Sequence, residues 1–121
     1  MSYDIRLVNK KSSEVERAKF TPNREGTYCL TDDEVRDCEF NITYNYAPHF
    51  RKVLDTDKGI RVIYGMTANE SIPVLEKAIS MLGDDVVEDY WQSTEGNAKE
   101  SLKCLLEIAK SSNPDSVWEG D

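Results

Sequence analysis

Apolar and polar residues alternate in the first half of the chain, and this pattern predicts β-strands. It covers about residues 3–8, 26–31 and 38–46, and a period of two places successive side chains on opposite faces of a sheet. In the third segment the apolar positions are Phe40, Ile42, Tyr44 and Tyr46. We expect a central strand there, with these four side chains in the core. Short polar connections between the three segments favour an antiparallel meander.

Further along the chain the apolar period lengthens to three or four residues, which predicts helices. Pro48 suits the first turn of a short helix, because its missing N–H needs no partner there, and the polar run 55–59 should end that helix. Residues 60–64 suit either a further strand or a helical turn, and both remain open. The last helix is predicted to begin near Thr94 and to stop at Asn113-Pro114.

The middle helix has two conflicting start signals. Thr67 and Glu70 have the spacing of a capping box. With that start Pro73 would lie beyond the first turn, where a proline removes a backbone hydrogen bond. A start near Asn69 or Ser71 lessens the conflict. The apolar stripe that follows predicts a helix of several turns ended by a glycine.

Strands first and helices after predict an α+β domain. We expect an antiparallel sheet of three or so strands from the N-terminal half, packed against two or three helices from the C-terminal half. With 121 residues, a single globular domain over residues 1–121 is expected. Trp118 should pin the tail to this domain, because an exposed terminal tryptophan would be costly. Residues 9–24 are polar, and whether they are ordered stays open.

The chain is acidic, with 15 basic and 23 acidic residues and a net charge of −8. This balance argues against direct binding of nucleic acid or of an anionic membrane, since both need clustered lysine and arginine. It allows a protein partner, in particular a basic one, attracted over a long range. Acidity that serves only solubility is the alternative.

The cysteines and the N-terminus indicate a cytoplasmic protein. The three cysteines form no C-x-x-C pair and are odd in number, which favours free thiols in a reducing compartment. The first residues form no basic leader and no long apolar run. Neither zinc-ligand spacing nor an EF-hand pattern is present, so no metal or cofactor is expected.

Neutral polar residues near the only histidine form a first candidate site. Asn41, Thr43 and Asn45 form a neutral polar row, which is unusual in a chain with 31% charged residues. This row could face a ligand or solvent. His49 would have to carry any histidine-based acid–base chemistry, but no motif ties a nucleophile to it. A local hydrogen bond at a helix start is the alternative role of His49. Asn97, at the predicted start of the last helix, could close such a pocket.

An acidic and aromatic cluster before the last helix forms a second candidate site. Its residues are Asp84, Asp85, Glu88, Asp89, Tyr90 and Trp91. Aromatic anchors dominate the energetics of protein interfaces, so a negative patch flanked by aromatics suits the docking of a protein partner. The alternative is a charged turn whose aromatic side chains enter the core. Tyr90 or Trp91 could also close the first candidate site.

Several segments together resemble a family of small uncharacterised bacterial and phage proteins. They are MSYDI (residues 1–5), NITYNYAPHF (41–50), GIRVIYG (59–65), ESIPVLEKAI (70–79), EGNAK (95–99) and WEGD (118–121). These segments span most of the chain after residue 40. The resemblance implies a bacterial or phage cytosolic protein, and it brings no catalytic residues with it.

Two functions are compatible with these patterns. The first is a non-catalytic acidic binding protein of the inhibitor or immunity type, which docks a larger or more basic protein through the acidic cluster. The alternative is a small-molecule domain that binds a nucleotide or sugar and could be enzymatic. Its pocket would lie around Asn41, Thr43, Asn45 and His49. The two differ in geometry, since the second requires these side chains to converge on one cavity.

Overall fold

Strands come first and helices after, as the sequence predicts for an α+β fold, except that one strand, β5 (Val117–Gly120), follows the last helix. The computed structural model of the chain describes residues 2–19, 35–84 and 93–121. The strands are β1 (Ser2–Val8), β2 (Arg17–Lys19), β3 (Val35–Asp37), β4 (Glu39–Thr43) and β5 (Val117–Gly120). The helices are α1 (Ala47–Val53), α2 (Ala68–Ser80) and α3 (Glu95–Ser111), and the 3-10 turns are η1 (Tyr44–Tyr46) and η2 (Gly59–Ile63). The predicted fold class is confirmed.

The main sheet has three antiparallel strands in the order β4-β1-β5. β1 lies in the middle, because Asp4 pairs with Asn41 of β4 and Arg6 pairs with Glu119 of β5. β2 and β3 form a separate two-stranded antiparallel sheet. The expectation of a central strand at residues 38–46 is therefore wrong, because β1 is central in this sheet and the third strand comes from the end of the chain. The strand expected at residues 26–31 lies outside the described residues.

β4 is also shorter than the alternation predicts. It ends at Thr43, whose Oγ1 accepts a hydrogen bond from the backbone N–H of Asn45 at 3.2 Å and so caps η1. Such local side-chain bonds compete with strand pairing. Phe40 and Ile42 are buried from the strand, as expected, and Tyr46 is fully buried from within the 3-10 turn. Tyr44, also expected in the core, is only partly buried, because it lies in the same turn at the edge of the core. The apolar residues of this segment thus reach the core through two backbone conformations.

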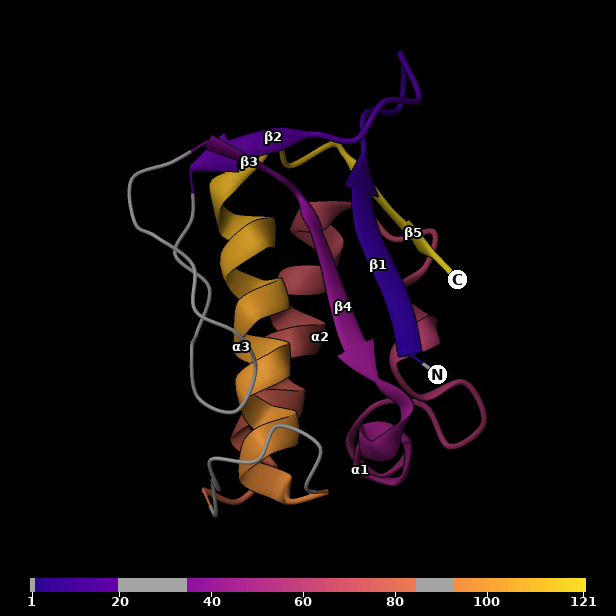
Figure 1. Cartoon of the computed structure of the whole chain (residues 1–121), viewed down its shortest axis with the longest axis vertical. Helices are drawn as coiled ribbons and strands as arrows, with labels where there is room; N and C mark the ends of the chain where they lie inside the picture. The colour runs from indigo at the N-terminus through magenta and orange to yellow at the C-terminus, as the bar shows by residue number, and fades with distance from the viewer. Residues whose placement is uncertain (1, 20–34, 85–92) are drawn as a thin grey trace.

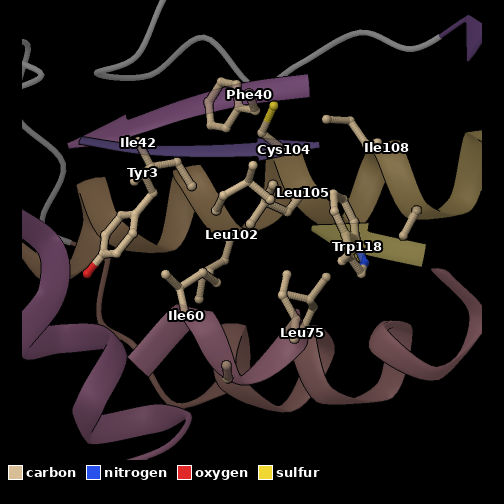
Figure 2. Close-up of a cluster of buried hydrophobic side chains, with 14 of the residues drawn as sticks. Tyr3, Phe40, Ile42, Ile60, Leu75, Leu102, Cys104, Leu105, Ile108 and Trp118 are labelled. Carbon is tan, nitrogen blue, oxygen red and sulfur yellow. The ribbon is translucent and has the colours of Figure 1, made fainter. Parts of the chain in front are cut away.

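Helices α2 and α3 pack against each other and cover one face of the main sheet (Figure 1). The core lies between these layers, and Figure 2 shows side chains of the sheet and of the helices meeting there. Its fully buried members include Ile5, Ile42, Leu75, Leu102 and Leu105. Burying one such side chain contributes roughly 1.5–3 kcal/mol. The other face of the sheet is turned away from the helices and carries polar side chains.

Trp118 on β5 closes this core, as expected for the tail. Its side chain is 1% exposed, and its indole N–H donates a hydrogen bond to Ser71 Oγ at 2.7 Å. The Ser71 hydroxyl donates in turn to the carbonyl of Ala68 at 2.8 Å. The polar edge of the indole is therefore satisfied within the core, which buried polar groups require.

α2 begins at the earlier of its two predicted starts. Both hydrogen bonds of the capping box are present, from the N–H of Glu70 to Thr67 Oγ1 at 3.1 Å and from the N–H of Thr67 to Glu70 Oε1 at 2.9 Å. The alternative start near Asn69 or Ser71 is not the one adopted, and Pro73 lies inside the helix. The residue four positions before it, Asn69, is exposed. The carbonyl that loses its helical partner can then be solvated.

Two segments that the sequence left open are ordered where the structure describes them. Asn9 folds the turn after β1, since its Oδ1 accepts hydrogen bonds from the backbone N–H groups of Lys11 and Ser12 at 2.9 and 3.0 Å. Residues 59–63 form the 3-10 turn η2, with Ile60 and Ile63 fully buried. Tertiary burial of these two side chains settles the choice between strand and helical turn.

Candidate functional site

Polar side chains and backbone groups from three separate segments meet at the start of α3, at the end of the molecule where α1 lies (Figure 1). We call this cluster the α3 junction. It comprises Asn45, His49, Lys52, Gly83, Asp84, Ser93, Glu95 and Lys99. The junction brings together members of both predicted sites, His49 and Asn45 from the first and Asp84 from the second.

His49 is tied to α3 by a serine that the sequence did not single out. Its Nε2 lies 3.2 Å from Ser93 Oγ, and the Ser93 hydroxyl donates to the backbone carbonyl of Asn45 at 2.8 Å. A hydroxyl has one proton and a carbonyl can only accept, so His49 donates from Nε2. In this arrangement the imidazole holds Ser93 in place and does not remove its proton. The bond spans 44 residues and is tertiary, not local to the start of α1.

Glu95, the first residue of α3, joins the other segments of the junction. Its Oε1 accepts from the backbone N–H of Gly83 at 3.0 Å, and its Oε2 accepts from Lys52 Nζ at 3.2 Å. These two donors, the Gly83 N–H first, hold the pKa of Glu95 below its ordinary value. A carboxylate in the first turn also suits the positive end of the helix. Glu95 therefore links α1, α3 and the segment after α2.

Asp84 is the member of the acidic cluster that the structure describes. Its Oδ1 accepts from Lys99 Nζ at 2.6 Å, while the Asp84 side chain stays 87% exposed. The ammonium of Lys99 lowers the pKa of Asp84, so this carboxylate is ionised at neutral pH. The other predicted partner-binding residues lie outside the described residues: Asp85, Glu88, Asp89, Tyr90 and Trp91.

The expected row of neutral polar residues does not continue along one strand face. Asn41 lies on the outer face of the sheet, where its Nδ2 donates to Ser2 Oγ at 2.8 Å and to Asp4 Oδ1 at 2.7 Å. Thr43 is 1% exposed and caps η1, and this turn carries Asn45 away from the strand. The geometry thus associates Asn45 with His49 and leaves Asn41 on the sheet.

Asn97 is fully buried in the first turn of α3. Its backbone N–H donates to Thr94 Oγ1 at 3.1 Å, which makes Thr94 the N-cap and confirms the predicted start of this helix. Ser and Thr at such positions are typical helix starts. Ser93 directly precedes this cap, and a serine at that position carries no sequence signal that marks it as a site residue.

Two hollows are lined by residues of the described ranges. One, of about 590 Å³, lies over β1 and β4 and is lined by Asp4, Ile5, Arg6, Glu39, Phe40 and Asn41. The other, of about 460 Å³, is lined by Asn9, Lys10, Lys11, Thr67, Asn113 and Asp115. Of the predicted ligand-binding residues, Asn41 is the one found among these linings.

The two cysteines within the described ranges, Cys38 and Cys104, are buried and form no disulfide with each other. Burial raises the pKa of the Cys38 thiol to about 11. A thiol with so high a pKa is protonated at neutral pH and therefore a poor nucleophile. In the same ranges, no set of three or more His, Cys, Asp or Glu side chains is arranged to hold a metal ion.

Comparisons with protein-family models, curated proteins and solved structures gave no match to this chain. The resemblance to a bacterial and phage family therefore stays a prediction. Within the described ranges, no helix has the length and apolarity that crossing a membrane requires. What the fold and the site define together is an α+β domain with a polar junction at one end and an exposed carboxylate beside it.

Proposed function

We propose that this protein is a non-catalytic acidic binding protein, of the inhibitor or immunity type, that docks a larger or more basic protein. The observation that carries the proposal is Asp84, an ionised and 87% exposed carboxylate held by Lys99. It directly precedes the acidic and aromatic residues 85–91 in the sequence. An anchored charge next to aromatic residues suits a binding surface, because less side-chain freedom is lost on docking.

The distribution of charge along the chain supports the same proposal. Residues 20–34 and 85–92 contain seven of the 23 acidic residues and one of the 15 basic ones. The remainder, with 16 acidic and 14 basic residues, is close to neutral, and its described part contains seven ion pairs. The excess negative charge is thus concentrated in two stretches of sequence. Such concentration attracts a basic partner and speeds association.

The alternative, a small-molecule site, has one supporting observation. Asn45 and His49 meet through Ser93, and their polar groups lie at an exposed junction. The hydrogen-bond directions argue against His49 as the base for Ser93, and Asn41 lies apart on the sheet. A nucleotide or sugar that raises the melting temperature of the wild type but not of His49→Gln would favour this alternative.

Capture of partners from the source cell tests the main proposal. The bait variant Asp84→Asn, Asp85→Asn, Glu88→Gln, Asp89→Asn should lose a partner that the wild type recovers in stoichiometric amount at low salt. The matched control neutralises four exposed carboxylates elsewhere, Glu14→Gln, Asp57→Asn, Glu76→Gln, Glu107→Gln, and should keep that partner. Equal loss with both variants would show that net charge alone matters. Recovery of no stoichiometric partner by the wild type, at low or at physiological salt, would contradict the proposal.

A further inference from the structure

The outer face of the main sheet is a polar surface that the proposed docking site does not include. α2 and α3 cover the opposite face (Figure 1). Asp4, Glu39 and Asn41 on the outer face are all exposed, and a hollow of about 590 Å³ lies over β1 and β4. We call this hollow the β1–β4 groove. Its volume lies within the range of roughly 300–1,000 Å³ that ligand sites occupy.

The charges on this face do not balance. Arg6 lies directly between Glu39 of β4 and Glu119 of β5 in the strand register, and its Nε bonds to Glu119 at 3.0 Å. Opposite charges on directly opposed strand positions attract, so Arg6 is engaged by Glu119. Asp4 and Glu39 add two further carboxylates to the same face, so the described charged residues of this face carry an excess of negative charge.

The hydrogen-bonding groups of the groove also favour a cationic occupant. The amide Nδ2 of Asn41 is engaged by Asp4 Oδ1 and Ser2 Oγ, which orients the Asp4 carboxylate. Carboxylates accept hydrogen bonds and do not donate them when ionised. A complementary ligand must therefore supply donors and positive charge, as lysine and arginine side chains do.

We propose that the β1–β4 groove binds a short basic segment of the protein partner, whose lysine or arginine side chains meet Asp4 and Glu39. This inference rests on the proposed function and adds a second contact surface to it, away from Asp84. The β1–β4 groove runs over two neighbouring strands and can hold an extended segment, whose basic side chains would reach the carboxylates beside Arg6. The contact is exposed, so its affinity should fall steeply with ionic strength.

An octalysine peptide is a direct probe of this groove. At low ionic strength, amide chemical shifts of the labelled protein should change first along β1 and β4. The isosteric variant Asp4→Asn, Glu39→Gln keeps the acceptor for Asn41 and should weaken octalysine binding by about tenfold. The control Glu14→Gln, Asp57→Asn removes the same charge elsewhere and should weaken it by less than about twofold. The proposal that the groove binds a basic segment would be wrong if both variants weakened octalysine binding equally. It would also be wrong if the chemical shifts changed mainly elsewhere, or if octalysine did not bind at all.

Partner capture separates failure of the groove from failure of the proposed function. If the groove variant binds octalysine and the captured partner like the wild type, while neutralising residues 84–89 abolishes capture, the groove is wrong and the acidic docking protein stands. If the groove variant alone loses both the peptide and the partner, the groove stands and the role of residues 84–89 is wrong. If the wild type recovers no partner, the proposed function fails, and the shift map still decides whether the groove binds a basic peptide.

Discussion

Two hydrogen bonds in this protein have the same chemistry in opposite surroundings. In the core, the indole N–H of Trp118 donates to Ser71 Oγ at 2.7 Å across 47 residues. At the α3 junction, the ring N–H of His49 donates to Ser93 Oγ at 3.2 Å across 44 residues. The first is buried and the second exposed. Because unmet hydrogen bonds cost most where water is excluded, we expect the core pair to determine stability and the junction pair to orient a surface.

The largest effect should follow from removing the buried indole. Trp118→Ala leaves a cavity between β5 and the helices and frees Ser71 of its donor, and such truncations cost about 3–5 kcal/mol. Urea unfolding should show a midpoint shifted far down or no cooperative transition. Trp118→Phe keeps most of the buried area and should lose clearly less. Similar losses for both variants would mean that the indole N–H, and not the buried area, is what matters.

The direct comparison of the two serines should give the next largest effect. Ser71→Ala leaves the indole N–H buried without an acceptor, which costs about 1–3 kcal/mol, whereas Ser93→Ala exposes its partners to water and should cost about 0.5 kcal/mol or less. Ser101→Ala is the control for loss of a buried hydroxyl, because Ser101 Oγ donates only to the carbonyl of Ala98, at 2.6 Å. Unfolding free energies in urea measure all three. A larger loss of unfolding free energy for Ser93→Ala than for Ser71→Ala would mean that the junction pair, and not the core pair, determines stability.

The smallest effect should be a pH-dependent one at the α3 junction. The pKa of Glu95 is lowered in the folded protein, so its ionised form stabilises the fold above the ordinary pKa of a glutamate, near 4.3. That contribution is lost as the pH falls through the lower folded-state value. The difference in unfolding free energy between the wild type and Glu95→Gln should therefore shrink below about pH 4.

Glu107→Gln is the control, because Glu107 lies on the exposed side of the same helix. It removes one negative charge but no contact of the α3 junction. Its unfolding should be followed over the same pH range and at two salt concentrations. Identical curves for the two variants would mean that the contacts of Glu95 with Gly83 and Lys52 contribute nothing. Exposed contacts of this kind add little to the stability of the fold, and their main effect is to link Gly83 and Lys52 to the start of α3.

Much of the local structure could be predicted because its causes lie within a few residues. The Thr67–Glu70 capping box, the Thr94 cap and the α+β order all follow from short-range patterns. The role of Trp118 followed from the cost of exposing it. Ser93 could not be found in this way, since a single serine before a helix has no distinguishing pattern. The bond from His49 exists only because α1 and α3 meet at one end of the molecule.

The sequence by itself determined the fold class, the start of α3 and the charge, because propensity, capping and hydrophobic period act through neighbouring residues. Only the tertiary structure decided that β1 is the central strand and that β5 completes the sheet. These outcomes depend on competition between strands far apart in the chain, which no local pattern encodes. The same long-range packing divided the predicted polar row between the β1–β4 groove and the α3 junction.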